Sequence, residues 1–151
     1  MSSSRTKPEG ASEPYLLCVE DNADDCFLTR RTLARNDFPH AVVCVADGAQ
    51  ALEHVQHAAT APLAILLDSR LPKLDGHEVL LALRSDESTR RIPVLLLVGS
   101  FDETRKAWRE TADACLLKPL DWQELDAELT RLGVLADGTP VIGNRAIGAR
   151  V

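Results

Sequence analysis

Four charged residues stand at the ends of short apolar runs and could do chemistry together. They are Glu20, Asp21, Asp68 and Lys118. Three carboxylates that lie close together repel one another, and a hard divalent cation such as Mg²⁺, which prefers oxygen ligands, relieves that repulsion. A carboxylate can also be the nucleophile that takes up a phosphoryl group, while Mg²⁺ and an ammonium neutralise the charge. These residue types therefore predict phosphoryl chemistry, provided that the fold brings them together.

The elements that must position these residues are five apolar runs alternating with helix-like segments. The runs are continuously apolar, which is typical of strands covered on both faces of a parallel sheet. The segments between them carry apolar residues at helical spacing, with Asp75 and Asp121 as expected N-caps and Glu124 as a capping-box partner. We predict strands at 15–19, 41–45, 63–67, 94–98 and 114–117, and helices at 24–36, 49–58, 77–83, 104–111 and 121–132.

Alternating strands and helices predict an α/β fold. Parallel pairing with right-handed crossovers gives a doubly wound, five-stranded parallel sheet with helices on both faces. Chemistry in such sheets gathers at the carboxyl ends of the strands. Taken singly, Glu20 and Asp21 could be a polar turn, Asp68 an ordinary strand-ending acid and Lys118 a loop residue before proline. Their joint placement at three strand ends favours a functional site.

Composition limits the classes of function. The 151 residues suit one domain with short tails, and 45% hydrophobic content indicates a globular fold. A net charge of −6 argues against a nucleic-acid-binding surface. No apolar run is long enough to cross a membrane, and the polar N-terminus lacks the apolar core of a signal peptide. We therefore expect a cytoplasmic protein that binds neither nucleic acid nor membrane.

The four cysteines show neither CxxC spacing nor a metal-ligand pattern. They are Cys18, Cys26, Cys44 and Cys115. Three of them lie in apolar strand segments, where a free thiol behaves as a small hydrophobic side chain. We expect all four to be reduced and structural, as in a reducing compartment.

Four sequence motifs together resemble the receiver domains of two-component response regulators, over about residues 15–132. They are V-E-D-N at 19–22, L-L-D at 66–68 with L-P-K-L-D-G at 71–76, I-P-V at 92–94 and K-P at 118–119. The resemblance implies the flavodoxin-like strand order 2-1-3-4-5. It divides the chain into a flexible arm at 1–13, a receiver domain at 14–132 and a C-terminal extension at 133–151.

The resemblance also implies roles for individual residues. Asp68 matches the phosphorylated aspartate, and Glu20 and Asp21 match the acidic pair that holds Mg²⁺ together with it. Arg70 matches the position whose backbone carbonyl binds the metal, and Lys118 matches the lysine that contacts the phosphoryl group. The donor would be a sensor histidine kinase. A receiver of this kind catalyses only its own phosphorylation and dephosphorylation and is not an ordinary metabolic enzyme.

Several further segments resemble one subgroup, the small single-domain regulators paired with bacterial phytochrome-type histidine kinases. They are the run VEDNADDCFLTRRTL at 19–33, D-F-P-H at 37–40, V-A-D-G at 45–48 and R-R-I-P at 90–93. A phytochrome-type kinase is therefore the expected partner.

Two positions depart from the receiver pattern. Val98 stands where receivers usually carry Thr or Ser, and valine has no hydroxyl to donate to a phosphoryl oxygen. Ser100 could substitute if the loop bends back at Gly99. Cys115 stands where an aromatic switch residue is usual. These departures predict altered switching, or, as an alternative, a receiver-like binding module that acts independently of phosphorylation. Harmless variation is the third possibility.

Large apolar side chains in the last third predict a homodimer. They are Phe101, Trp108, Leu120 and Trp122. Because aromatic residues are enriched at interface hot spots, we expect contact through the fourth helix, fifth strand and fifth helix, although both tryptophans could instead fill the core. Residues 140–142 could also pack on the domain or on a second subunit, and disorder of this glycine-containing extension is the alternative. A flavin-binding protein of similar topology is disfavoured, because acids rather than a phosphate-cradling loop follow the first strand.

Overall fold

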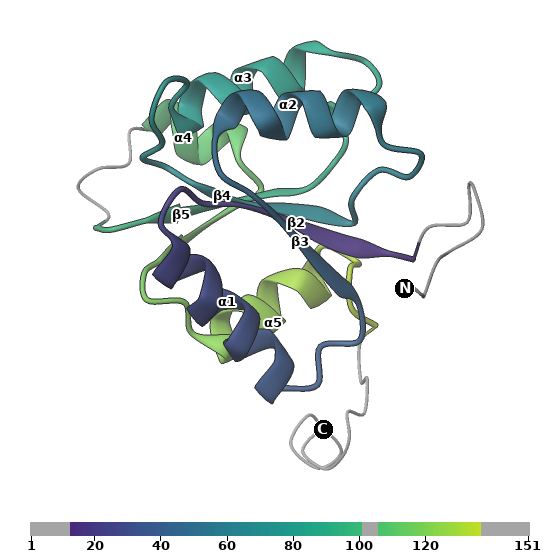
Figure 1. Ribbon diagram of the computed structural model, residues 1–151, viewed down its shortest axis with the longest axis vertical. Helices are drawn as coiled ribbons and strands as arrows, with labels where there is room; N and C mark the ends of the chain where they lie inside the picture. The colour runs from purple at the N-terminus through teal and green to yellow at the C-terminus, as the bar shows by residue number, and fades with distance from the viewer. Residues whose placement is uncertain (1–12, 101–105, 137–151) are drawn as a thin grey trace.

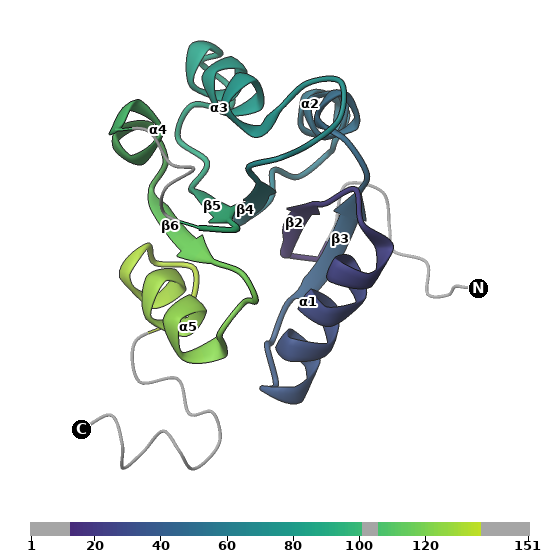
Figure 2. The ribbon, with the colours of Figure 1, turned by 90° about the vertical axis from the view of Figure 1, so that its left-hand side faces the viewer.

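The computed structural model describes residues 13–100 and 106–136 of the chain. Five strands form one parallel sheet between two layers of helices (Figures 1 and 2). Helices α2, α3 and α4 cover one face, and α1 and α5 cover the other. The strands are β2 (Tyr15–Val19), β3 (Ala41–Val45), β4 (Ala64–Asp68), β5 (Val94–Val98) and β6 (Ala114–Leu117). The helices are α1 (Ala23–Arg35), α2 (Gly48–His57), α3 (Gly76–Ser85), α4 (Lys106–Thr111) and α5 (Trp122–Arg131).

The strand order is β3-β2-β4-β5-β6, which is the predicted 2-1-3-4-5. All residues of the three inner strands β2, β4 and β5 are buried, whereas β3 and β6 at the edges are mostly half-buried. Because alternate side chains of a strand point to opposite faces, each inner strand contributes side chains to two separate cores, one on each face of the sheet. Leu17 and Leu67 belong to the core under α2, α3 and α4, and Leu16 and Leu66 to the core under α1 and α5.

Short polar side chains cap the helices where the sequence predicts. Asp75 accepts a hydrogen bond from the backbone of Glu78, whose side chain accepts from the Asp75 backbone, so that α3 begins with a full capping box. Asp121 accepts from the backbone of Glu124 and caps α5. Asn22 caps α1 in the same way by accepting from Asp25. These caps fix where each helix begins relative to the strand before it.

The predicted elements agree with the observed ones to within a residue or two at most ends. The strand expected at 63–67 begins one residue later, and α3 extends to Ser85. Residues 104 and 105 of the expected fourth helix, the arm at 1–12 and residues 137–151 lie outside the described residues. Beyond α5 the chain continues along the domain, and Leu135 is buried on the core under α1 and α5. Within the described residues, no helix has the length and apolar character needed to cross a bilayer.

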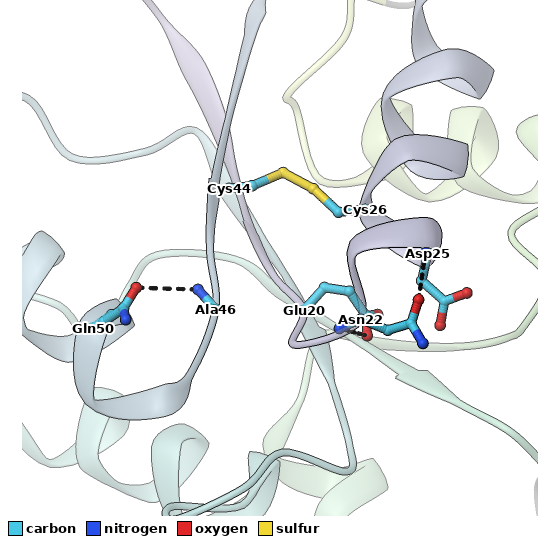
Figure 3. The surroundings of a disulfide bond; sticks show 7 residues. All are labelled: Glu20, Asn22, Asp25, Cys26, Cys44, Ala46 and Gln50. Atoms are coloured by element: carbon cyan, nitrogen blue, oxygen red, sulfur yellow. Dashed lines mark hydrogen bonds between the residues drawn. A yellow bond between two sulfur atoms is a disulfide. The ribbon is translucent and has the colours of Figure 1, made fainter.

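The prediction of four reduced cysteines is wrong for two of them. Cys26 on α1 and Cys44 on β3 form a disulfide, while Cys18 and Cys115 are free (Figure 3). The two partners are 18 residues apart in sequence, so no local spacing signals the pair. They meet because α1 packs beside the edge strand β3, a contact that follows from tertiary structure alone.

Candidate functional site

The carboxyl ends of three strands bring the predicted charged residues to one edge of the sheet. Asp68 is the last residue of β4 and is buried. The Glu20 backbone N–H, just beyond β2, donates to the Val45 carbonyl at 3.0 Å. The Lys118 N–H, just beyond β6, donates to the Val98 carbonyl at 2.8 Å. Because these bonds continue the sheet past the strand ends, the sheet itself sets the position of each functional residue.

Three carboxylates gather at this edge, as predicted. One oxygen from each of Glu20, Asp21 and Asp68 lies within 4.8 Å of the others, a spacing that suits a shared metal ion. Glu20 and Asp68 are buried, whereas Asp21 is exposed. Burial, together with the hydrogen bond and charge of Asp68, raises the pKa of Glu20 to about 7. A cation bound beside these carboxylates would favour their ionised form.

The Lys118 ammonium lies against the same cluster. Its Nζ atom is 3.2 Å from Asp68 Oδ2 and 3.3 Å from Glu20 Oε1. Burial alone would lower the pKa of Lys118, but the charges of Asp68 and Glu20 outweigh burial and raise that pKa above its ordinary value. Lys118 therefore stays protonated and supplies a fixed positive charge beside the Asp68 carboxylate.

The loop after β4 supports Asp68 directly. The backbone N–H of Arg70 donates to Asp68 Oδ1 at 3.1 Å, which sets the orientation of the carboxylate. Gly76, the first residue of α3, packs against the same segment. A Cβ atom at Gly76 would lie 2.6 Å from the Asp68 carbonyl oxygen and 2.9 Å from Ser69 Cα. Only a residue without a side chain allows α3 to begin this close to Asp68.

The two unusual positions contribute side chains to the core rather than to the carboxylate cluster. Val98 ends β5, is fully buried and belongs to the core under α2, α3 and α4. Cys115 lies within β6, half-buried, against that same core. Ser100 lies two residues beyond Val98 and is half-buried. Neither Val98 nor Cys115 brings a hydroxyl or an aromatic ring to the site.

The two tryptophans lie on opposite sides of the sheet. Trp108 packs against the core under α2, α3 and α4 and stacks on His77, with ring centroids 5.0 Å apart. Trp122 packs against the core under α1 and α5 together with Leu120. Both rings are half-buried, so each fills part of the core and leaves part of its surface accessible. Phe101 lies outside the described residues.

Sequence reasoning missed Asp25, which the fold brings to the site from the first turn of α1. Its Oδ2 atom lies 3.4 Å from Lys118 Nζ. Both residues line a pocket of about 160 Å³ between α1 and the segment after β6, whose apolar part includes Leu28, Pro119 and Leu120. No local sequence signal distinguishes Asp25 from Asp24 beside it, because both stand in the first turn of α1.

Comparison with known proteins gives the family. The model of the response regulator receiver domain matches residues 16–130. The chain also matches curated transcriptional regulatory proteins from Salmonella typhimurium and Mycobacterium leprae, at 39% and 35% identity. It spans about half the length of these relatives, 50% and 51% respectively.

Solved structures agree with this match. The bacteriophytochrome response regulator AtBRR is 30% identical, with a TM-score of 0.76 over 89% of this chain and 100% of that one. The phosphorylated cyanobacterial phytochrome response regulator RcpA is 31% identical, with a TM-score of 0.69 over 83% and 98%. The receiver domain of the sensor histidine kinase PA1611 from Pseudomonas aeruginosa, which has a magnesium ion in its active site cleft, is 29% identical, with a TM-score of 0.69 over 81% and 99%. The chain therefore belongs to the response regulator receiver domain family and is similar to phytochrome response regulators.

Proposed function

We propose that this chain is a single-domain response regulator that accepts a phosphoryl group on Asp68 from a sensor histidine kinase. The observation that carries the proposal is the setting of Asp68, which is buried, shares a cluster with Glu20 and Asp21, and lies 3.2 Å from the Lys118 ammonium. A nucleophilic carboxylate needs positioning and charge neutralisation more than covalent help. This arrangement is suited to both.

The donor set fits a Mg²⁺ ion. Carboxylates of Glu20, Asp21 and Asp68 lie close enough to share one ion, and the backbone carbonyl of Arg70 is the expected fourth protein ligand. Hard oxygen ligands in small number, with room left for phosphate and water, are what Mg²⁺ prefers. When bound, Mg²⁺ would neutralise the carboxylates and the oxygens of the incoming phosphoryl group. The magnesium ion in the PA1611 receiver domain supports this assignment.

In the proposed reaction, an Asp68 carboxylate oxygen forms a bond to phosphorus on the side opposite the leaving group. The bond between phosphorus and the donor's leaving atom breaks, and its electron pair stays with that atom. Lys118 balances the negative charge on the phosphoryl oxygens from its place beside Asp68. In the reverse step, water attacks phosphorus, the bond from phosphorus to the Asp68 oxygen breaks, and inorganic phosphate leaves, which restores the free carboxylate.

The partner we propose is a phytochrome-type sensor histidine kinase. The similarity to AtBRR and RcpA, together with the motifs shared with that subgroup, supports this choice. We propose that this chain meets the kinase in the cytoplasm. Within it, residues 14–132 would form the receiver domain, with an arm at 1–13 and an extension at 133–151.

The proposal is tested by intact mass spectrometry after incubation with acetyl phosphate and Mg²⁺. The wild-type protein is expected to gain one phosphoryl group, and the Asp68→Asn variant none. The gain should disappear when Mg²⁺ is removed by chelation. Equal phosphorylation of wild-type protein and Asp68→Asn would rule out Asp68 as the acceptor.

A second candidate function is a receiver-like binding module that acts independently of phosphorylation. Val98 and Cys115 favour it, because a buried valine and a half-buried thiol replace the hydroxyl and the ring that usually respond to the phosphoryl group. Either module could form a homodimer through α4, β6 and α5, where part of Trp122 remains accessible. Elution volume on a sizing column distinguishes the two functions. A change on phosphorylation supports the phosphoryl switch, and its absence supports the binding module.

A further inference from the structure

Lys118 has three carboxylate partners. Its Nζ atom lies 3.2 Å from Asp68, 3.3 Å from Glu20 and 3.4 Å from Asp25. An ammonium group has three N–H donors, so it can bond to all three at once. The first two partners belong to the cluster that fits Mg²⁺, whereas Asp25 does not. Of the three carboxylates that contact Lys118, only Asp25 would not also be a ligand of the bound cation.

The position of Asp25 is fixed by the start of α1. Its backbone N–H donates to the Asn22 side chain at 2.9 Å, the N-cap bond of the helix (Figure 3). A carboxylate in the first helical turn is also stabilised by the helix dipole. The Asp25 side chain is 42% exposed, and its Oδ2 atom lies 3.4 Å from Lys118 Nζ. The start of α1 therefore places the Asp25 carboxylate opposite Lys118.

The Lys118 ammonium requires a further ion pair to stay beside Asp68 once a cation is bound. Its long side chain is 27% exposed and borders the pocket between α1 and the segment after β6. A cation on Glu20, Asp21 and Asp68 would weaken the pull of Glu20 and Asp68 on the ammonium, because positive charges compete for the same oxygens. Without another anion, the side chain could turn outward through the pocket.

We infer that Asp25 is a positioning residue that keeps the Lys118 ammonium beside Asp68 when the carboxylate cluster is occupied by a cation. This inference rests on the proposed function for its consequence, which is faster phosphoryl transfer to Asp68. Asp25 itself touches neither the phosphoryl group nor the metal in this scheme and acts only through Lys118.

Asp24 provides a matched control. It stands next to Asp25 in the same first turn, carries the same charge and is exposed, and it makes no ion pair with any residue in the described part of the chain. Asp24→Asn and Asp25→Asn therefore change the charge at the start of α1 equally. Only Asp25→Asn removes a carboxylate that pairs with Lys118.

The first measurement observes Lys118 directly, without any phosphodonor. The ¹⁵N-labelled ammonium signal of Lys118 is recorded by NMR in saturating Mg²⁺. Wild-type protein and Asp24→Asn are expected to show a protected signal, and Asp25→Asn a signal broadened by exchange with water. An unchanged signal in Asp25→Asn, or equal broadening in both variants, overturns the inference.

The second measurement is the rate at which Asp68 gains a phosphoryl group from acetyl phosphate in saturating Mg²⁺. Asp25→Asn is expected to react about three- to fivefold more slowly, as suits a partly exposed ion pair, and Asp24→Asn at the wild-type rate. If Asp25 only repelled the anionic donor, Asp25→Asn would react faster, and that outcome overturns the inference. Failure of wild-type protein to react would contradict the proposed function alone, because the NMR comparison is still decisive for the pairing.

Discussion

The site depends on the charge of Lys118 in two opposite ways. The ammonium lies within 3.3 Å of Glu20 and Asp68, so it competes with a metal ion for the same oxygens. Yet the same charge would stabilise the phosphoryl group on Asp68. Metal affinity and phosphoryl transfer are therefore expected to respond in opposite directions when this charge is removed.

Lys118→Met keeps the aliphatic part of the side chain and removes its charge. We expect Mg²⁺ to bind about tenfold more tightly, because a repelling charge near the metal is lost, and phosphorylation by acetyl phosphate to be slower. Calorimetry measures the first effect and intact mass the second. Lys73→Met is the matched control, since Lys73 pairs with Asp47 at 3.6 Å and, within the described residues, not with Glu20, Asp21 or Asp68. Weaker Mg²⁺ binding in Lys118→Met would contradict this picture of competition.

Some residues of this site could be predicted from the sequence, and one could not. Glu20, Asp21, Asp68 and Lys118 were predictable, because they stand at the ends of apolar runs and parallel strands place their carboxyl ends at one edge. Asp25 was not, because the choice between Asp24 and Asp25 depends on how α1 is rotated against the sheet. That rotation is set by side-chain packing over the whole helix, which no local pattern records.

At the scale of elements, the contact between α3 and the end of β4 determines where Asp68 lies. Gly76→Ala places a methyl group 2.6 Å from the Asp68 carbonyl oxygen, so α3 or the strand end must move. We expect a loss of about 1–3 kcal/mol in the free energy of unfolding, as for other overpacked sites, together with slower phosphorylation of Asp68. Urea unfolding and intact mass after acetyl phosphate measure the two effects.

Gly48→Ala separates these two effects. Gly48 begins α2, and a Cβ atom there would meet Val79 Cγ2 at 2.5 Å and the Leu74 carbonyl at 2.8 Å. The crowding is similar but lies away from Asp68. We expect this variant to lose stability and to keep the wild-type phosphorylation rate measured on folded protein. Equal slowing in both variants would show that general destabilisation, not displacement of Asp68, is responsible.

The elements themselves were predictable because their apolar runs and caps are local features. The disulfide between α1 and β3 was not, since Cys26 and Cys44 meet only after α1 has packed beside the edge of the sheet. Closing a loop of this length is expected to stabilise the fold by about 3 kcal/mol, chiefly by restricting the unfolded chain. The Cys26→Ser, Cys44→Ser double variant should therefore unfold at lower urea than the oxidised wild-type protein. Under a thiol reductant the two proteins should become alike.

Alkylation mapped by mass spectrometry tests the disulfide independently. Cys26 and Cys44 should be labelled only after unfolding and reduction. Cys18 should resist labelling in the folded protein at about pH 8, because burial, with the nearby Glu20 charge, raises the pKa of its thiol to about 12 and leaves almost no reactive thiolate. It should react after unfolding without reductant. Labelling of all four cysteines in unfolded, unreduced protein would mean that no disulfide forms.

Over the whole molecule, the two ends of the sheet carry different groups of polar residues. The carboxyl ends of the strands carry the charged site, and the amino ends of β5 and β6 carry a network centred on Arg84. The Arg84 guanidinium pairs with Asp113 at 2.7 Å and donates to the carbonyls of Ile92 and Thr111 at 2.9 Å and 3.1 Å. Asp113 in turn accepts from the Val94 backbone at 2.8 Å. One side chain thereby joins α3 to the starts of both strands.

This division predicts that stability and chemistry can be changed separately. Arg84→Ala removes the ion pair with Asp113 and the donor to three carbonyls, those of Arg90, Ile92 and Thr111, so we expect the free energy of unfolding to fall by about 2–3 kcal/mol. Phosphorylation of Asp68 in the folded fraction should keep its wild-type rate, because the network lies at the opposite end of the strands. Arg91→Ala, an exposed arginine nearby with the same charge, should change neither quantity. Urea unfolding gives the free energy of unfolding of all three proteins, and the acetyl phosphate reaction gives their phosphorylation rates. A slowed reaction in folded Arg84→Ala would mean that the sheet couples its two ends, and that the amino-end network is part of the signalling machinery.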